Sequence, residues 1–387
     1  MEYYQNALNL FKAKKYDKAA KAFQKAIDRK NETFKSLAGL SESLGIIGEK
    51  EKQAEVNKIA ESISITTNRI DIFYKSYGDF YSEIKDYDKA ILFYETAIHI
   101  NRNYSNAYHN LALVYYEKKE YDKAIEYCNM SARLNPRDDT IYNTLGIIYT
   151  DMKEYDKAIE SYRKMILINP KDEYPYNGLG NVYTLLGDYD TAVQYYKKAI
   201  EINPRFEYPY NGIGIIYKDF LKDYVKAIEY FKKSIKVKPY FDLPYLNLAD
   251  IYKEKSEFKN AISNYKKYLD INNNSNNNES VLFKLAECYK NIKDYDNAIE
   301  CYKKLLKINP KNENAFDSLG KIYNIIGRKD KSIQTFKKAI KLAPDNPYLY
   351  NNIANVYVEL SNYKEAVNYY KKSIELFSNK FNLESKL

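Results

Sequence analysis

The chain has 387 residues, of which 44 are tyrosine and none is tryptophan, and its formal net charge at pH 7 is +9. No stretch approaches the roughly 18 apolar residues that a membrane-spanning helix needs, so we expect no membrane insertion. Residues 1–6 read as the start of the helical pattern described below rather than as a secretory signal peptide. We therefore expect a cytoplasmic protein.

A tetrapeptide recurs along the chain at a nearly constant interval. Tyr-Asp-Lys-Ala begins at residues 16, 87, 121 and 155, looser copies begin at 189, 224, 258, 295, 329 and 363, and a degraded copy begins at 50. The intervals are 34 residues in most cases and 35 or 37 in the others. A fixed period of this size is typical of a solenoid, in which small units stack on one another. Length alone would suggest two or three domains, but the continuous period predicts a single solenoid over residues 1–380.

We divide this solenoid into eleven repeats, numbered in chain order. Their boundaries are 1–33, 34–70, 71–104, 105–138, 139–172, 173–206, 207–241, 242–278, 279–312, 313–346 and 347–380.

Residues 1–70 hold the two less regular repeats. Repeat 2 has polar Gln53 and Asn57 where other repeats carry alanine and an aromatic residue, and we interpret it as a worn repeat rather than a linker. Residues 71–278 hold repeats 3 to 8, and residues 279–380 hold repeats 9 to 11. Repeat 7 has one extra residue, which we place in its turn, around 220–223.

An asparagine-rich segment, 272–278, replaces the proline that closes other repeats. We expect a solvated loop there, and the alternative is a hinge between two halves of the solenoid. Residues 381–387 are expected to form a tail that is too short for a separate capping helix.

Each repeat carries the apolar periodicity of two helices. In repeat 6, Tyr176, Leu179 and Tyr183 recur at helical spacing, and a second series follows the polar turn Gly187-Asp188. This pattern predicts a helix, a tight turn and a second, antiparallel helix. None of the ten prolines falls inside a predicted helix, because each one either starts a first helix or closes a second helix. The sequence therefore predicts an all-α fold.

A small residue recurs on both helices of each pair. On the first helix it is glycine or alanine, as at Gly146, Gly180 and Ala249, and on the second helix it is alanine, as at Ala158 and Ala192. A missing or single-carbon side chain lets two helix backbones approach closely, while tyrosine and leucine fill the space around the contact.

These recurring positions resemble the tetratricopeptide repeat, and repeat 6 shows them in the order Tyr176-x2-Leu179-Gly180-x2-Tyr183…Ala192-x3-Tyr196…Pro204. Tyrosine replaces the tryptophan that the family usually has at the fourth position. The resemblance covers nearly the whole chain and implies a right-handed α-solenoid superhelix of antiparallel helix pairs. It also implies that first helices line a concave face, with positions two, five and nine of each repeat pointing into the groove and position six beside them.

In repeats 4 to 7 these positions carry uncharged residues, with asparagine at position five of three consecutive repeats. An asparagine amide offers both donors and an acceptor, so a row of them can pair with the backbone of an extended peptide. The row looks like the groove of the O-linked N-acetylglucosamine transferase repeats, although no glycosyltransferase domain follows in these residues. The alternative is that it reflects an asparagine-rich composition. The candidate groove residues are Asn106, His109, Asn110, Thr140, Asn143, Tyr174, Asn177, Asn181, Tyr208 and Asn211.

A second function of the resembled family is the clamping of a chaperone's C-terminal carboxylate. That clamp needs lysine at position five and asparagine at position nine. Lys75 and Asp79 come nearest to it, and Asp79 has the wrong charge. We therefore expect no binding to chaperone tails.

The sequence shows no recognisable catalytic or metal site. Cys128, Cys288 and Cys301 lack the spacing of metal ligands, and we expect reduced thiols in the core. His99 and His109 lie in separate repeats, and we favour groove lining or solvent exposure of His109 over a catalytic role. We expect no enzyme activity, no cofactor and no metal.

Lysine pairs recur on the second helices, as at Lys197-Lys198 and Lys303-Lys304, with acidic residues nearby. In the resembled family these helices face outward, so the pairs predict a solvated convex face rather than a track for nucleic acid. The related pentatricopeptide repeats, which read RNA, have a period of 35 residues, and the dominant period of 34 argues against them.

We therefore expect a non-enzymatic protein–protein interaction scaffold that binds an extended or helical peptide segment in its concave groove. The alternative is a self-associating structural solenoid, or the repeat part of a larger assembly. It rests on Val367, Tyr370 and Leu376, which the last repeat would leave partly exposed. The expected partners are proteins or peptides, including a second copy bound through the terminal repeat.

Overall fold

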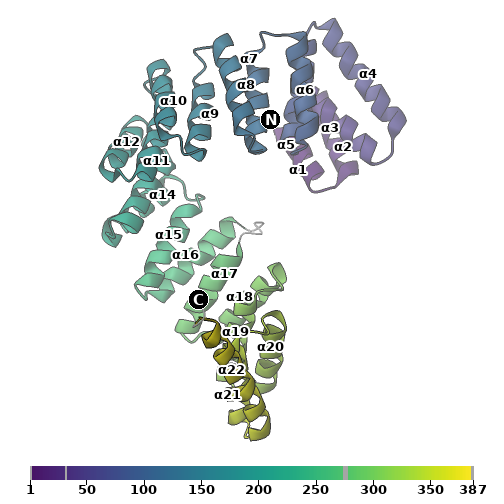
Figure 1. Cartoon of the computed structure of the whole chain (residues 1–387). Helices are drawn as coiled ribbons and strands as arrows, with labels where there is room; N and C mark the ends of the chain where they lie inside the picture. Colours follow the sequence, from purple (N-terminus) through teal and green to yellow (C-terminus); the bar gives the residue numbers. More distant parts are fainter. Residues whose placement is uncertain (1, 31–32, 273–277, 385–387) are drawn as a thin grey trace. The chain divides into compact units, whose positions relative to one another are not determined.

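The computed structural model describes residues 2–30, 33–272 and 278–384, with the backbone alone over 379–384. The chain divides into two compact units, Met1–Asn203 and Pro204–Leu387, which we call the N-terminal and C-terminal units and describe separately. Within the described residues there is no strand, and each unit is a stack of antiparallel helix pairs (Figure 1). The predicted all-α solenoid with about 22 helices is thereby confirmed.

Within its described residues the N-terminal unit contains twelve helices, and odd numbers mark the first helix of each repeat. They are α1 (Glu2–Lys12), α2 (Tyr16–Asp28), α3 (Thr33–Ile46), α4 (Lys50–Thr66), α5 (Ile70–Glu83), α6 (Tyr87–Ile100), α7 (Ser105–Glu117), α8 (Tyr121–Leu134), α9 (Asp139–Asp151), α10 (Tyr155–Ile168), α11 (Tyr174–Leu186) and α12 (Tyr189–Ile202).

The C-terminal unit continues the same alternation. Its helices are α13 (Glu207–Ile215), η1 (Ile216–Phe220), α14 (Tyr224–Val237), α15 (Leu243–Glu254), α16 (Phe258–Ile271), α17 (Glu279–Asn291), α18 (Tyr295–Ile308), α19 (Glu313–Ile325), α20 (Lys329–Leu342), α21 (Pro347–Glu359) and α22 (Tyr363–Glu384).

The close approach of paired helices depends on aromatic rings that lie over glycine. The ring of Tyr196 in α12 covers Gly180 in α11, and a Cβ atom on Gly180 would come within 2.6 Å of that ring. Tyr162 covers two glycines, Gly146 of its own repeat and Gly178 of the next, with 2.6 and 2.5 Å to the places where their Cβ atoms would be. Such distances are far shorter than a carbon–carbon contact, so neither glycine can gain a side chain without movement. One ring therefore joins the two helices of a repeat and also joins that repeat to the next.

Repeat 2 holds the helix pair α3 and α4, and that it is a worn repeat rather than a linker stays a prediction. α4 has 17 residues, yet Ala60 and Ser64 are its buried residues. Gln53 and Asn57 replace the small and aromatic residues that would pack there, and α3 lies directly against α5. The loss of these packing residues explains why α4 has little contact with its neighbours.

The extra residue of repeat 7 is absorbed by a helix rather than by the turn in which we placed it. Residues Ile216–Phe220 form a π-helical turn, in which the N–H of Leu221 donates to the carbonyl oxygen of Ile216 at 3.1 Å. A π-turn takes up one more residue than an α-turn and leaves the following residues in register. The second helix of repeat 7 therefore begins at Tyr224, as in the other repeats.

The last helix is longer than we predicted. α22 extends to Glu384, so residues 381–384, which we assigned to the tail, continue the helix. Pro310 and Pro344 close the second helices of repeats 9 and 10, and no proline or glycine occupies the corresponding place here. Residues 273–277 of the asparagine-rich segment lie outside the described residues. The predicted loop and its alternative, a hinge, fall in that part of the chain.

We predict that Gly180→Leu destabilises the fold by about 1–3 kcal/mol, because the new side chain must displace the Tyr196 ring. The free energy of unfolding, measured by denaturant titration, checks this. A change below about 0.5 kcal/mol would contradict the close contact.

Combining Gly180→Leu with Tyr196→Ala provides the control. Because the second change removes the ring that the leucine meets, the cost of the pair should be less than the sum of the single costs.

Candidate functional site

The predicted groove residues of the N-terminal unit lie on three successive first helices, α7, α9 and α11. These helices contact one another in order, α7 with α9 and α9 with α11. We call positions two, five, six and nine of these helices the first-helix wall. It consists of Asn106, His109, Asn110, Leu113, Thr140, Asn143, Thr144, Ile147, Tyr174, Asn177, Gly178 and Asn181.

His109 is bonded to the next repeat. Its Nε2 atom lies 2.9 Å from the hydroxyl oxygen of Thr144, and that hydroxyl donates to the carbonyl oxygen of Thr140 at 3.1 Å. A hydroxyl has a single hydrogen, so Nε2–H of His109 must be the donor to Thr144. Burial lowers the pKa of His109, which keeps the ring neutral near pH 7. The ring thus serves as a neutral link between α7 and α9.

Asn110 is bonded to a buried carboxylate in α5. Its amide donates to Oδ1 of Asp79 at 2.7 Å, and the hydroxyl of Tyr94 donates to the same oxygen at 2.9 Å. On the other oxygen, Nζ of Lys75 lies 2.8 Å away. Lys75 and Asp79, the two residues nearest to a carboxylate clamp, are therefore paired with each other. This arrangement fits the expectation that no clamp exists.

The bond from Tyr94 to Asp79 recurs along the chain, a feature that we did not predict. A second-helix tyrosine donates to the polar residue 15 positions before it, at position nine of the first helix. The pairs are Tyr94–Asp79, Tyr196–Asn181, Tyr265–Asp250, Tyr302–Glu287 and Tyr370–Asn355.

The sequence carries a partial signal of this pairing, which repeats 5 and 10 do not follow. In repeats 4 and 7 the second-helix residue is Cys128 or Phe231, which has no hydroxyl, and position nine is apolar Leu113 or Ile215. Asn181 belongs to the paired set, because its amide oxygen accepts from Tyr196 at 2.7 Å. Its amide oxygen therefore already has a partner inside the fold.

Two asparagines of the wall differ from these paired residues. The residue at position six of the repeat after Asn143 is Gly178, which cannot bond as Thr144 bonds to His109. Within the described residues, the side chain of Asn143 has no hydrogen bond, and the buried Oδ1 atom of Asn177 has no partner. Buried side-chain oxygens are bonded in the large majority of cases, so the state of Asn177 requires an explanation.

Position two contributes exposed side chains at one edge of the wall. Asn106 and Thr140 are exposed, and Tyr174 is 52% exposed. The hydroxyl of Thr140 donates to a carboxylate oxygen of Asp138 at 2.6 Å, as part of the cap of α9. Tyr174 therefore offers the largest open contact area beside Asn177.

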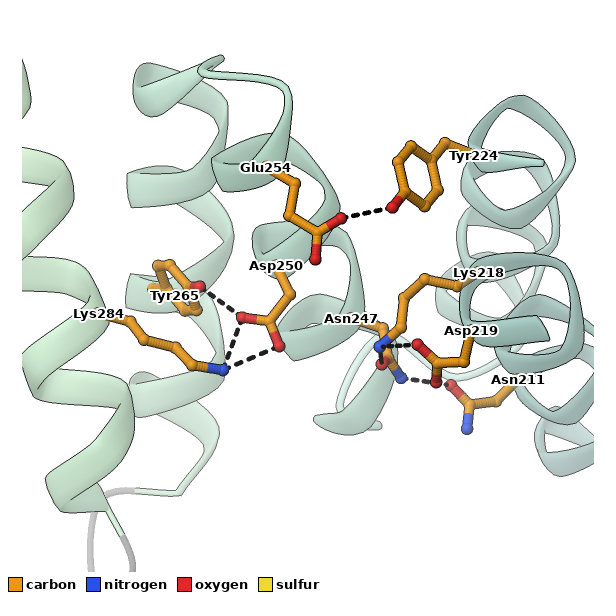
Figure 2. A network of polar contacts seen from close by, with 9 residues as sticks. All are labelled: Asn211, Lys218, Asp219, Tyr224, Asn247, Asp250, Glu254, Tyr265 and Lys284. Carbon is orange, nitrogen blue, oxygen red and sulfur yellow. Dashed lines mark hydrogen bonds and ion pairs between the residues drawn. The ribbon is translucent and has the colours of Figure 1, made fainter. Parts of the chain in front are cut away.

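The last two predicted residues, Tyr208 and Asn211, lie in the C-terminal unit. Tyr208 is 45% exposed, whereas Asn211 is buried and accepts from the amide of Asn247 at 3.4 Å. Asn247 in turn accepts from Lys218 at 2.6 Å, and Lys218 pairs with Asp219 (Figure 2). Asn211 is thus held in an internal polar network. That Tyr208 and Asn211 serve the same ligand as Asn177 stays a prediction.

Figure 2 also shows how the charge of a carboxylate at position nine, Asp250, is balanced in the C-terminal unit. Asp250 accepts from the hydroxyl of Tyr265 at 2.5 Å and pairs with Lys284 of the next repeat at 2.9 Å. A carboxylate between a tyrosine and a lysine links two repeats and leaves little net charge on this part of the first helices.

The cysteines are buried and unpaired, as expected. Burial raises the pKa of Cys128 to about 12 and that of Cys288 and Cys301 to about 11, so all three are protonated thiols near pH 7. The described residues contain no group of three His, Cys, Asp or Glu side chains that could hold a metal ion. Nor does any described helix have the length and apolar character needed to cross a membrane.

The lysine pairs of the second helices are exposed to solvent, as at Lys303 and Lys304. Many of these lysines pair with an acidic residue one turn away, as Lys304 does with Glu300 at 2.8 Å and Lys233 with Glu229 at 2.6 Å. This is the solvated, mixed-charge surface that the sequence predicted.

A cavity of about 690 Å³ lies elsewhere, among α16, α17 and α18 of the C-terminal unit. Leu282, Tyr289 and Cys301 form part of its apolar floor, and Lys266 and Lys304 stand at its rim. None of the predicted groove residues lines it, and Lys304 is already paired with an acidic residue.

Comparison with known families identifies the repeat. Models described as "Tetratricopeptide repeat" match residues 174–206, 280–312 and 347–380 and residues 208–241 and 244–275, and a "TPR repeat" model matches residues 146–187 and 320–361. The chain belongs to the tetratricopeptide-repeat family. A model described as "Anaphase-promoting complex, cyclosome, subunit 3" matches residues 83–165. Membership of this family supports a protein-interaction scaffold.

Solved structures are similar to this chain. A human IFIT1 dimer with m7Gppp-AAAA is 17% identical, covers 96% of this chain and 88% of that chain, and has a TM-score of 0.50. Pseudomonas aeruginosa pilF is 21% identical over 53% of this chain and 92% of that chain, with a TM-score of 0.45. MamA is 28% identical over 42% of this chain and 94% of that chain, with a TM-score of 0.37. No curated protein matches the sequence.

We predict that Tyr94→Phe lowers the free energy of unfolding by about 1.5–3 kcal/mol, because it removes a hydrogen bond to the buried carboxylate of Asp79. Tyr162→Phe is the matched control. The Tyr162 hydroxyl lies beside the neutral hydroxyl of Thr150, so this change should cost about 0.5–1.5 kcal/mol. Equal losses in the two variants would show that the carboxylate bond contributes nothing special.

We also predict that His109 makes stability depend on pH. Its pKa in the folded chain lies below the ordinary value of 6.5, so just below pH 6.5 the unfolded chain binds more protons than the folded chain. The contribution is therefore complete above pH 6.5 and is lost as the pH falls toward the folded pKa. Unfolding titrations at several pH values should show a shallower decline for His109→Gln, and parallel curves for variant and wild type would contradict the linkage.

Proposed function

We propose that the chain is a non-enzymatic scaffold that binds an extended segment of a partner protein along the first-helix wall, with Asn143 and Asn177 as its principal contacts. The observation that carries this proposal is the buried Oδ1 atom of Asn177, which has no partner within the described residues. Leaving such an atom unpaired costs about 1–3 kcal/mol, and a rotation of the Asn177 side chain that brings this oxygen to the surface would let a backbone N–H of a ligand remove that cost.

The hydrogen bonds of the neighbouring side chains limit which residues of the wall can contact the ligand. His109 and Asn110 are bonded inside the fold, so at positions five and six of the wall the open amide groups belong to Asn143 and Asn177, on adjacent first helices. Packed helices lie about 8–10 Å apart, and an extended chain covers that distance in about three residues. Each amide can both donate to a carbonyl oxygen and accept from an N–H, so the two recognise backbone rather than a particular side chain.

Tyr174 adds contact area next to Asn177. It is 52% exposed, and its ring can cover apolar side chains of the ligand while its hydroxyl stays in water. The wall from Asn106 to Asn181 carries no charged side chain, so binding there should depend little on salt, and a phosphate backbone would find no cation on it. We therefore favour the binding of a protein or peptide partner, in the cytoplasm, as the function of this wall.

Self-association is the second candidate, and one observation favours it. Val367 of α22 is 49% exposed, whereas Ile299 and Ile333 at the same place in α18 and α20 are 5% and 9% exposed. Ile374 of α22 is 64% exposed, and Tyr370 and Leu376 are half-buried. Light scattering separates the candidates, since a monomer at micromolar concentration would leave this apolar face without a self-association role.

We predict that Asn143→Ala combined with Asn177→Ala weakens peptide binding by roughly 5- to 150-fold, if two hydrogen bonds of about 0.5–1.5 kcal/mol each are lost and add. The probe is a peptide selected from a random library on the wild-type chain, and its affinity is measured by fluorescence anisotropy at low and high salt.

Asn129→Ala combined with Gln194→Ala is the matched control, since both side chains are exposed on second helices. This pair should leave the affinity unchanged. Asn177→Ala alone should not lower the free energy of unfolding, because it removes an unpaired oxygen. Peptides that bind both double variants as tightly as wild type, or that dissociate at high salt, would place the site elsewhere.

A further inference from the structure

The second helix of repeat 1 carries a row of exposed cations. Lys18, Lys21 and Lys25 of α2 and Arg29 directly after it follow one another at i, i+3, i+7 and i+11, and all four are exposed. At 100° per residue they fall within about 80° around the helix axis, and at 1.5 Å per residue they extend over about 16 Å. We call these four residues the α2 cation row.

The row lies in the most basic part of the chain. Residues 12–30 contain eight basic and two acidic residues, a net charge of +6 within a chain whose total is +9. Within the described residues, no ion pair joins a residue of the row to a carboxylate, whereas Lys123 pairs with Glu120 and Lys157 with Glu154. The cause is in the sequence, since Lys15 occupies the place before α2 that Glu120 and Glu154 occupy before α8 and α10.

Tyr3 of α1 holds two of these cations in place. The ring centroid of Tyr3 lies 5.3 Å from Nζ of Lys25 and 6.0 Å from Cζ of Arg29. The other lysines that contact a ring in the described chain also pair with a carboxylate, namely Lys35, Lys89, Lys123, Lys157, Lys226, Lys233 and Lys238.

This difference determines whether the charge of the α2 cation row is available to a partner. A ring orients a cation without neutralising it, whereas a carboxylate cancels its charge. Lys25 and Arg29 are therefore held in position while their charge remains available to an anionic partner.

We propose that the α2 cation row binds an acidic segment of a partner protein, at a surface separate from the first-helix wall. An extended segment rises about 3.3 Å per residue and points alternate side chains the same way, so its carboxylates recur about every 6.6 Å. The cations of the row recur every three or four residues, which is about 4.5–6 Å along the helix. A segment of about five residues with acidic side chains at alternate positions therefore matches the length and the spacing of the row.

The surroundings of the row disfavour the other anionic partners. A nucleic-acid backbone would continue onto the next second helix, but α4 carries Glu51, Glu55 and Glu61 among its lysines, and Lys52 pairs with Glu49 at 2.6 Å. A membrane surface would need several large apolar side chains exposed beside the cations. Phe23 of α2 is completely buried and Ile27 is half-buried, and the ring of Tyr3 in α1, which is 38% exposed, is engaged with Lys25 and Arg29. A short acidic peptide needs neither feature.

The test uses a fluorescent peptide of about ten residues with glutamate alternating with serine, and a second peptide with glutamine in place of glutamate. We expect the full chain to bind the glutamate peptide, with an affinity that falls as salt rises, and to ignore the glutamine peptide. Lys18→Glu, Lys21→Glu and Lys25→Glu together should weaken binding at least about tenfold, because three attractive pairs become repulsive. The Asn143→Ala, Asn177→Ala variant should bind the acidic peptide as wild type does.

The matched control changes the net charge by the same amount at another place. Lys331, Lys337 and Lys338 of α20 are exposed, and changing all three to glutamate should leave the affinity within about twofold of wild type. An equal loss in both triple variants would show that the peptide senses overall charge and would overturn the proposal. Tighter binding of a single-stranded oligonucleotide or of anionic phospholipid vesicles at the row, without competition from the peptide, would overturn it as well.

Discussion

The contact between an aromatic ring and a glycine backbone is the constraint on which the rest of the stack depends. Tyr162 covers Gly146 and Gly178, so a single side chain determines both the spacing inside one repeat and the spacing to the next. Because a small residue, glycine or alanine, recurs at this place from repeat to repeat, the first helices come side by side in a regular order. That order brings the polar residues of α7, α9 and α11 onto one surface, although they are 34 residues apart in the sequence.

The polar residues of that surface have two roles, and hydrogen bonds distinguish them. Most of them stabilise the stack, as Asp79 does by accepting from Tyr94 and Asn110, and as His109 does by donating to Thr144. In five repeats the polar residue at position nine accepts from a tyrosine hydroxyl, so a polar residue there is no evidence of a ligand by itself. Asn143 and Asn177 remain, and an amide that the fold leaves unpaired is better evidence of a binding role than one that merely faces the groove.

The lysines of the second helices can also be divided into those that are paired inside the fold and those that are not. Along most second helices a lysine has an acidic residue one turn away, and such exposed pairs contribute little stability while they keep the surface neutral. Repeat 1 departs from this rule because Lys15 stands where Glu or Asp precedes many of the other second helices, and an aromatic ring takes the place of the carboxylate at Lys25 and Arg29. The repeat architecture can therefore carry an uncompensated charge on α2 without any change of fold.

The sequence by itself determined the repeat length, the two helices of each repeat and the close contact at Gly180, because helical periodicity and glycine placement are local properties of the chain. It did not determine that the extra residue of repeat 7 enters a π-turn, or that α22 runs to Glu384, since both depend on packing and on the absence of a stop signal. The tertiary structure also decided which asparagines are occupied. Asn110 and Asn181 bond to residues 31 and 15 positions away, and Asn211 lies in a buried network, while Asn143 and Asn177 stay unpaired within the described residues. Asn143, Asn177 and Asn211 share position five of their repeats, so the difference among these three lies in the side chain that a neighbouring helix brings within hydrogen-bonding distance.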